Sequence, residues 1–176
     1  MKILLGVSGG IAAYKSAALT SSLVQSGHEV QVVLTSAAEQ FVGRATFQAL
    51  TGRHVAGELF DAHYPLGAHI ELAEWASLLC VAPTSADVLA KAAQGLADDL
   101  LSTLLLSFTG PVVFAPAMNA DMWQQPAVQR NVAQLEKDGR QFVGPAEGWQ
   151  SCRRSGPGRM AEPDEIHAAI EKLRTD

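Results

Sequence analysis

The sequence lacks any apolar run long enough to cross a bilayer, which argues against a membrane-spanning helix. Its opening apolar stretch is interrupted by Gly6, Gly9 and Gly10 before the core of a secretory signal peptide could form. From these two absences we expect a cytoplasmic protein that does not associate with membranes.

Cysteine and basic charge are also scarce. Two cysteines among 176 residues cannot supply a disulfide framework, so Cys80 and Cys152 are both expected to be thiols. A formal net charge of −5 leaves no basic surface strong enough to neutralise several phosphates of a nucleic acid. With 48% hydrophobic residues the chain can bury a substantial core, and we expect one domain that acts on a small molecule and needs no metal.

What the sequence does contain is a series of short apolar segments, each followed by a turn and a helix-compatible stretch. Strands are expected at residues 2–7, 30–34, 78–82 and 112–115, and helices at 11–26, 37–49 (one or two), 85–94, 99–107, 126–139 and from 162 or 163 to 174. Such alternation implies a parallel sheet covered on both faces. The sequence therefore predicts an α/β fold: a Rossmann-like (flavodoxin-like) doubly wound parallel sheet in three αβα layers, as a single domain over residues 1–176.

Residues 144–163 show no clear periodicity and are expected to form a loop that is long for a compact domain. Loops of this length are usually functional lids or flexible connectors, and we expect this one to cover a substrate. It contains Cys152, which Arg153, Arg154 and Arg159 follow in sequence. Nearby cations favour the thiolate and suit a thiol to acid–base chemistry, although the arginines could equally form a solvated face. Cys80 lies within an apolar strand and is expected to be inert.

The first turn joins a strand to a helix through small residues, so its backbone N–H groups can approach a phosphate at the helix N-terminus. A third glycine at the dinucleotide spacing is missing, and Leu34-Thr35-Ser36 ends the second strand without an acidic residue. A mononucleotide therefore fits better than NAD, while a tight turn without a ligand is an equally good interpretation. The hydroxyls of Ser36 and Ser85 follow two strand ends, where they can meet a ligand or cap a helix.

Two further segments carry residue types that suit a binding site. Pro116 to Trp123, PAMNADMW, follows the last predicted strand, at whose carboxyl end ligands collect. The amide of Asn119 can hydrogen-bond a carboxylate without bringing a charge, and a turn residue is the alternative. Met118, Met122 and Trp123 are interpreted as pocket walls.

These segments resemble a known family. The chain resembles the homo-oligomeric flavin-containing cysteine decarboxylases, whose signature P-x-M-N-x-x-M-W is matched by PAMNADMW. Three further stretches match this family in the same order: the opening GVSGGIAAYK, the stretch HIELAEWASLLCVAPTSADVLAKAAQGLADDLLS, and the segment from Cys152 to Met160. The resemblance implies FMN as cofactor and, within coenzyme A biosynthesis, conversion of 4'-phosphopantothenoylcysteine to 4'-phosphopantetheine. The flavin would oxidise the substrate to a thioaldehyde, CO2 would then leave, and the resulting enethiol would be reduced again.

The resemblance also implies roles for individual residues. His69, in the H-I-x-L stretch, would be the active-site histidine and Cys152 the proton donor, while Asn119, Met118, Arg159 and Met160 would bind the substrate. The FMN contacts would be Gly9, Gly10, Ile11, Ser36, Ser85, Ala86, Asp87, Val88 and Ala117. His28, His54, His63 and His167 match no motif and are expected to be structural or solvated.

Assembly and alternatives follow from the same resemblance. It implies a homotrimer or a dodecamer of trimers, with FMN and substrate between subunits, and a separate phosphopantothenoylcysteine synthetase in the pathway. A peptidyl-cysteine decarboxylase that stops at the enethiol, and a non-catalytic regulatory subunit with the same fold, are the alternatives. Cys152 argues against the first alternative, and the retention of His69, Asn119 and Cys152 together argues against the second.

The sequence departs from the family pattern at two places. Many relatives have Ala-Asn-Thr where this chain has Ala86-Asp87-Val88, and Cys-Gly-Asp where it has Cys152-Arg153-Arg154. A carboxylate beside a phosphate would be repulsive, so Asp87 is expected to cap the following helix or to meet the flavin ring or its ribityl chain.

Overall fold

A five-stranded parallel sheet forms the centre of the molecule in the computed structural model, which describes residues 1–174. Its strand order is β2-β1-β3-β4-β5. The strands are β1 (Lys2–Val7), β2 (Glu29–Leu34), β3 (Leu78–Thr84), β4 (Val112–Pro116) and β5 (Gln141–Phe142). The four predicted strands are confirmed to within two residues at each end, and the short edge strand β5 was not predicted.

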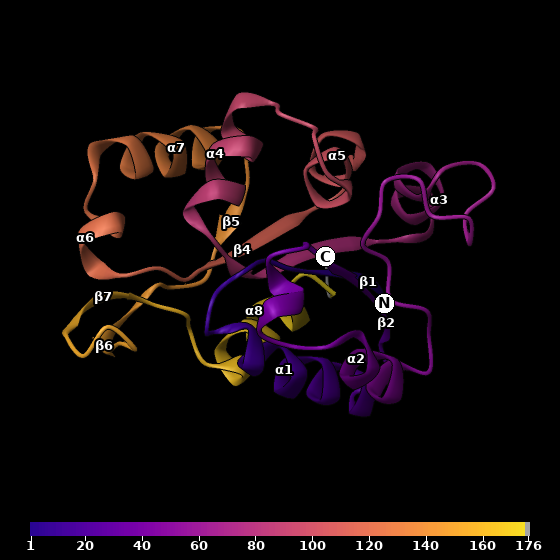
Figure 1. Cartoon of the computed structure of the whole chain (residues 1–176), viewed down its shortest axis with the longest axis horizontal. Coiled ribbons are helices and arrows are strands. Elements are labelled where there is room, and N and C mark those ends of the chain that lie inside the picture. Colours follow the sequence, from indigo (N-terminus) through magenta and orange to yellow (C-terminus); the bar gives the residue numbers. More distant parts are fainter. Residues whose placement is uncertain (175–176) are drawn as a thin grey trace.

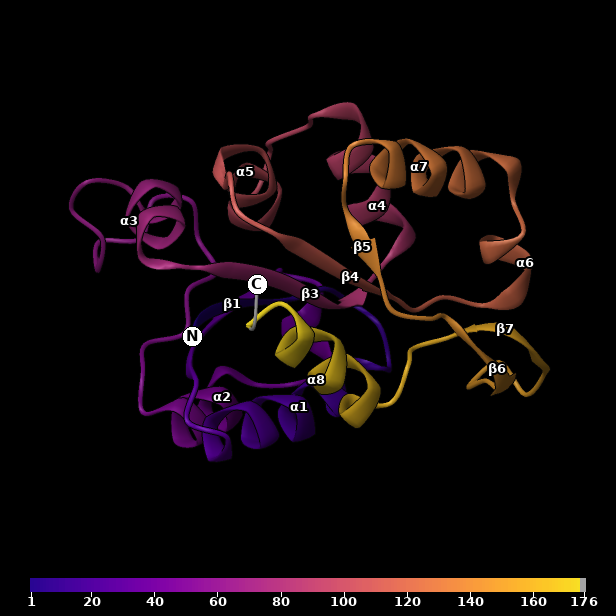
Figure 2. The ribbon, with the colours of Figure 1, turned by 180° about the vertical axis from the view of Figure 1, so that it is seen from behind.

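Helices cover both faces of this sheet, as Figures 1 and 2 show. One face carries α1 (Ala13–Gln25), the 3-10 turn η1 (Ala38–Gln40), α2 (Arg44–Thr51) and α8 (Pro163–Lys172). The other carries α4 (Ala86–Gln94), α5 (Leu100–Ser107) and α7 (Pro126–Lys137), with α3 (Ala68–Trp75) packed against α5 at one end of the molecule. The predicted three-layer, flavodoxin-like fold is therefore confirmed.

Alternating strand residues supply the two halves of the core. Leu5 packs with Leu19 of α1 and Ile166 of α8, whereas its neighbour Leu4 packs with Leu89 and Leu104 on the opposite face. Successive side chains of a strand point to opposite faces, so a strand buried on both sides must be apolar throughout. This requirement explains the continuous apolar segments by which the strands were recognised.

The segment predicted as a loop over residues 144–163 contains an antiparallel hairpin of β6 (Ala146–Trp149) and β7 (Ser155–Arg159). A short helix, α6 (Ala120–Trp123), lies near this hairpin. Both are at the opposite end of the molecule from α3 (Figure 1). The hairpin was missed because its residues have no apolar periodicity. Whether it covers a substrate stays a prediction.

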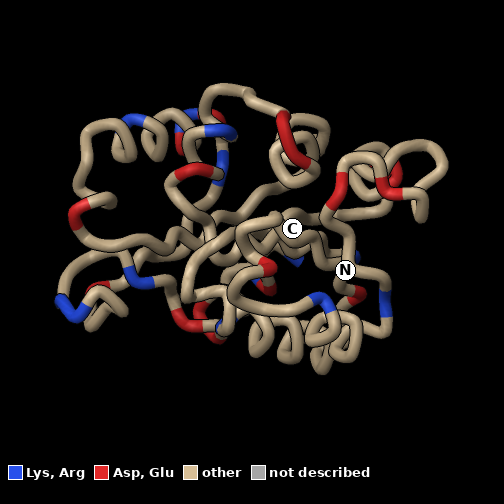
Figure 3. Tube along the Cα trace, in the orientation of Figure 1, with Lys and Arg blue, Asp and Glu red and all other residues tan. Residues whose placement is uncertain are grey.

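Charged residues of both signs are interspersed along the trace, as Figure 3 shows. Within residues 1–174, no helix has both the length and the apolar character needed to cross a membrane.

Candidate active site

A cavity of about 640 Å³ lies at the carboxyl ends of β1, β3 and β4. Four segments that are far apart in the sequence line it: the glycine turn with the start of α1, the start of α4, the chain after β4, and the β6–β7 hairpin with the residues that follow it. Among the predicted site residues, those that line the cavity are Gly9, Gly10, Ile11, Ser85, Ala86, Ala117, Met118, Asn119, Cys152, Arg159 and Met160.

The glycine turn presents unpaired backbone donors to the cavity. The N–H groups of residues 9–12 have no hydrogen-bond partner within the described part of the chain, and all four residues line the cavity. A side chain at Gly9 would collide with Ala37, because a Cβ atom there would lie 2.5 Å from the Cβ of Ala37. The turn is therefore packed tightly against the Ser36-Ala37 loop, and it leaves these free N–H groups at the cavity, where the N-terminus of a helix favours an anion.

Ser8 ties this turn to the neighbouring strand end. Its buried hydroxyl donates to the carbonyl of Pro83 at 2.8 Å and accepts from the N–H of Ser85 at 2.9 Å. The two turns that border the cavity are thereby held together, although 75 residues separate the partners Ser8 and Pro83. Ser8 was not singled out from the sequence.

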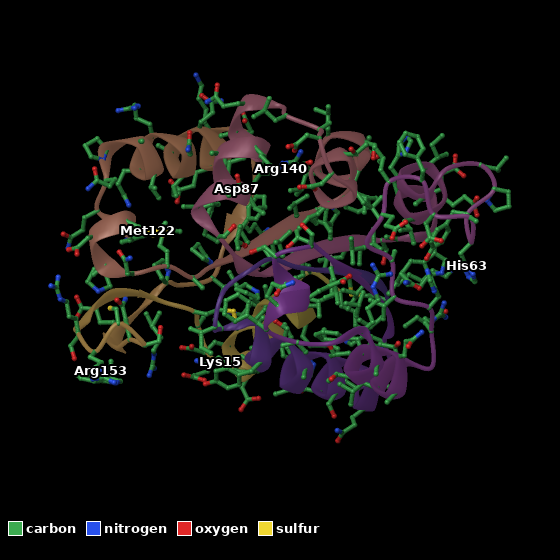
Figure 4. The ribbon with its side chains drawn as sticks, viewed as in Figure 1. Lys15, His63, Asp87, Met122, Arg140 and Arg153 are labelled. Atoms are coloured by element: carbon green, nitrogen blue, oxygen red, sulfur yellow. The ribbon has the colours of Figure 1, made fainter. Side chains whose placement is uncertain are left out.

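The start of α4 differs from the expectation for Asp87. Ser85 is the N-cap, its hydroxyl accepting from the N–H of Val88 at 3.3 Å. Asp87 is exposed and forms an ion pair with Lys91 at 3.4 Å, so the prediction that Asp87 caps the helix is wrong (Figure 4 shows its position on α4). Asp87, Val88 and Ser36 do not line the cavity.

Asn119 begins α6 as its N-cap, with Oδ1 accepting from the N–H of Met122 at 2.8 Å. Its Nδ2 group has no protein partner among residues 1–174 and is the part of the amide left for a ligand. Met118 and Met122 line the cavity, whereas Trp123 packs half-buried against the core, so the prediction that Trp123 is a pocket wall is wrong.

Cys152 is exposed in the turn of the hairpin, with Sγ 3.6 Å from Oε1 of Gln150. The arginines that follow it in sequence turn to other partners. Arg154 pairs with Asp121 at 3.3 Å and Arg159 with Glu162 at 3.2 Å. Arg153 lies at the tip of the hairpin (Figure 4) with a φ of 63°, the left-handed conformation that favours glycine.

His69 is the one predicted site residue that lies far from the cavity. It belongs to α3, which lies at the opposite end of the molecule from the hairpin in both views (Figures 1 and 2). Its Nδ1 atom is buried and has no hydrogen-bond partner within the described residues. A single copy of the chain therefore does not bring His69 together with Cys152 or Asn119.

Several cavity residues were not identified from the sequence. Lys15 donates to Oε1 of Glu162 at 2.9 Å, and Arg159 shares that oxygen, which links α1 to the start of α8. This hydrogen bond from Lys15 holds the pKa of the Glu162 carboxyl below its usual value despite an opposing effect of burial. The signal for Lys15 was its place in GVSGGIAAYK. Gln150 and Trp149 had no such signal.

The remaining cysteine and histidines lie outside the cavity. Burial raises the pKa of the Cys80 thiol to about 12, so it stays protonated and inert, as expected. His54 pairs with Asp61 at 2.7 Å. His28 and His167 converge on Glu171, with the three possible ligand atoms within 4.8 Å of one another. Their other ring nitrogens already face the Met1 amino group and the Ser22 hydroxyl, so hydrogen bonds account for this cluster.

Comparison with known proteins identifies the family. The Flavoprotein family matches residues 1–175. The chain belongs to this family. The chain is also 50% identical over 174 residues to the coenzyme A biosynthesis bifunctional protein CoaBC of Vibrio vulnificus, and 48% identical over 171 residues to that of Bacillus subtilis. The first similarity covers 98% of this chain but only 43% of the relative, and the second covers 97% of this chain and 42% of the relative. The chain thus spans less than half the length of these two relatives.

Solved structures of the family share the whole fold. A structure described as the FMN-dependent cysteine decarboxylase SpaF is 34% identical, with a TM-score of 0.84 over 98% of this chain and 94% of that one. A mutant of PPC decarboxylase complexed with pantothenoylaminoethenethiol is 29% identical, with a TM-score of 0.88 over 99% of this chain and 98% of that one. Both similarities extend over nearly all residues of this chain.

Proposed function

We propose that this chain is the decarboxylase of coenzyme A biosynthesis that converts 4'-phosphopantothenoylcysteine to 4'-phosphopantetheine with FMN as cofactor. The observation that carries the proposal is the joining, in one cavity, of an anion-binding glycine turn, the free amide group of Asn119 and the thiol of Cys152. The similarity to a bifunctional protein of coenzyme A biosynthesis, to an FMN-dependent cysteine decarboxylase and to a PPC decarboxylase supports it.

The residues present fit FMN. Four unpaired N–H groups at the N-terminus of α1 suit a phosphate, and the small side chains of Ala86 and Ala117 leave room for a flat ring. Exposed apolar groups at the cavity rim, among them Ile11 and Met122, suit the faces of an isoalloxazine. Of the predicted contacts, we retain for the cofactor those that line the cavity: Gly9, Gly10, Ile11, Ser85, Ala86 and Ala117.

Asn119 would bind the substrate carboxylate. Because Oδ1 already caps α6, only the Nδ2 donor is free, and a donor is what a carboxylate needs. A neutral amide orients the carboxylate without holding it as an ion pair, so the group remains free to leave as CO2. The buried Nε of Arg159, which has no partner within residues 1–174, offers a second donor in the same wall.

Bound FMN would supply the redox chemistry, taking two electrons from the cysteine-type end of the substrate and returning them after CO2 has left. Cys152 would donate the proton that completes the return of those electrons. Its thiol proton points to a neutral amide oxygen of Gln150, and its exposed position in the hairpin lets it approach a ligand in the cavity. This cysteine favours the complete reaction over one that stops at the enethiol.

A homotrimer, alone or within a dodecamer, is proposed because His69 needs a second copy to reach the cavity. In α3 and the segment before it, large apolar side chains are exposed at Phe60, Leu66 and Ile70, the first of them 93% exposed. The cavity rim exposes Tyr14 and Trp149 in a similar way. Contact between these surfaces of neighbouring copies would cover both and place His69 beside FMN and substrate.

We also propose that the protein acts in the cytoplasm, in the same pathway as the enzyme that makes its substrate. The bifunctional name of the CoaBC relatives points to a phosphopantothenoylcysteine synthetase as that partner.

The experiment that tests the proposal uses the purified protein with FMN and 4'-phosphopantothenoylcysteine. A yellow flavin spectrum, release of CO2 and formation of 4'-phosphopantetheine are expected, and Cys152→Ser should still release CO2 while its product remains the enethiol. A colourless protein that takes up no added FMN would refute the proposal. Accumulation of enethiol by the unmodified protein would instead favour the peptidyl-cysteine type of reaction.

A further inference from the structure

Gln150 is the one buried polar side chain among the described residues of the β6–β7 hairpin. It is 8% exposed, while its neighbour Trp149 is 65% exposed and Cys152 is also exposed. A buried amide is costly unless its donors and acceptors are satisfied, so the position of Gln150 calls for a physical reason.

All of its hydrogen-bonding capacity is used. Oε1 accepts from the N–H of Ala120 at 3.1 Å and from the thiol of Cys152 at 3.6 Å. Nε2 donates to the carbonyl of Pro157 at 2.9 Å and to that of Met118 at 3.4 Å. The reversed amide would place NH2 against an N–H and oxygen against two carbonyls, so the network determines its orientation.

These partners join the two segments that carry the proposed chemistry. Met118 and Ala120 are the residues on either side of Asn119, and Gln150 binds the backbone of both. The same amide oxygen receives the thiol proton of Cys152. One side chain therefore determines how the hairpin lies against the Asn119 loop and where the thiol proton points.

We propose that Gln150 is a positioning residue that holds the Cys152 thiol by a hydrogen bond and aligns it with the end of the substrate that Asn119 binds. Its importance for product formation rests on the proposed function. Its effect on the reactivity of Cys152 depends on the geometry alone and can be measured without substrate.

The first test is the rate at which iodoacetamide alkylates the protein at fixed pH. Cys80 is fully buried, so the reaction reports on Cys152, with Cys152→Ser as the blank. Gln150→Met removes every side-chain hydrogen bond of this residue at nearly constant volume, and loss of the acceptor should raise the rate about three- to tenfold. Gln134→Met, an exposed amide on α7, is the matched control and should leave the rate unchanged. An unchanged rate in Gln150→Met would overturn the proposal.

The second test separates positioning from general loosening of the hairpin. Gln150→Glu keeps an acceptor for Ala120 and Cys152 but turns a carboxylate oxygen toward the carbonyls of Met118 and Pro157. Protonation restores a donor, so activity relative to the unmodified protein at the same pH should recover as the pH falls. For Gln150→Met that ratio should stay flat. A ratio that does not change with pH for Gln150→Glu would count against the proposal, even if Gln150→Met fails to fold.

The third readout is the product. Gln150→Met should release CO2 while diverting product to the enethiol, and adding Cys152→Ser should cause no further diversion. If the unmodified protein neither binds FMN nor releases CO2, the proposed function fails, yet the alkylation test still decides the role of Gln150. If the unmodified protein is active and Gln150→Met matches it in alkylation and product, only the positioning role fails.

Discussion

At the scale of single residues, Asn119 caps a helix with the oxygen of its amide and is proposed to bind the substrate with the nitrogen. Its Oδ1 atom caps the N-terminus of α6 by accepting from the N–H of Met122, which leaves Nδ2 as a free donor. This division of one amide allows the two roles to be separated by mutation, because aspartate keeps the capping oxygen and loses the donor.

Asn119→Asp should therefore fold normally and lose activity. The N-cap bond to Met122 is kept, so the melting temperature should stay within about 2 °C of that of the unmodified protein. Two carboxylates then face each other in the cavity, and kcat/KM for CO2 release should fall about 100-fold or more. Asn119→Ala, which also loses the cap, is the control that should lower both stability and activity. Undiminished turnover in Asn119→Asp would rule out this role for the amide.

Arg153 gives a prediction about stability. Its φ of 63° makes it the only non-glycine residue of the described chain in the left-handed region, where a side chain costs about 1–2 kcal/mol. Arg153→Gly should raise the free energy of unfolding by about 0.5–1 kcal/mol, because part of the relief is offset by the greater flexibility of unfolded glycine.

The measurement is urea unfolding, with Arg154→Gly as the matched control. Arg154 does not have a positive φ and forms an ion pair with Asp121, so its replacement should destabilise the protein slightly. Equal effects of the two substitutions would show that left-handed strain at Arg153 is not the cause.

Residues of the site could be predicted from the sequence where they belong to a motif of unusual composition. Gly9, Asn119 and Cys152 stand in such motifs, and the structure brings them to one cavity. Gln150 could not be predicted, because its partner Ala120 lies 30 residues away and an isolated glutamine is ordinarily a surface residue. His69 stood in a motif as well, but the sequence could not show how far α3 lies from the cavity.

At the scale of elements, the connection between α4 and α5 is held by charge and capping. Lys91 contacts both Asp98 and Asp99 at 2.9 Å, and Asp99 forms a capping box with Ser102. Burial favours the neutral form of Asp99, but hydrogen bonds from Ser102 and Lys91 outweigh it and lower the pKa of this carboxyl. Asp99 is thus the acceptor on which the start of α5 depends.

This lowered pKa gives a pH dependence with a definite sign. A carboxyl whose pKa is lower in the folded state stabilises the fold above its unfolded pKa of about 4, and loses this effect as the pH falls through the folded value. Asp99→Asn should cost about 1 kcal/mol at pH 7 and progressively less below about pH 4. Unfolding by urea across this range is the measurement. The control, the more exposed Asp98→Asn, should show a smaller difference.

The elements themselves were predictable to different degrees for a physical reason. β1 to β4 are buried on both faces, so they had to be apolar and were visible as such. β5 has two residues at the sheet edge, and the strands of the hairpin contribute no side chain to the two core clusters. Neither leaves a hydrophobic period for sequence analysis to detect.

At the scale of the whole molecule, the distribution of site residues separates His69 from the rest. The cavity and the hairpin lie at one end of the sheet and α3 at the other (Figures 1 and 2). If neighbouring copies complete each other's sites, a copy that lacks His69 still supplies Cys152, and a copy that lacks Cys152 still supplies His69. The geometry therefore predicts complementation between two inactive variants.

His69→Asn and Cys152→Ser should each fail to form 4'-phosphopantetheine when assayed alone. After unfolding and refolding together in equal amounts, about a quarter of the sites should combine His69 from one copy with Cys152 from its neighbour, and product formation should return to about that fraction. Mixing the folded variants without refolding is the control, and this mixture should stay inactive if assembled copies do not exchange subunits during the assay. Refolded mixtures that remain inactive, while the unmodified protein recovers from the same treatment, would show that each copy uses its own histidine or none.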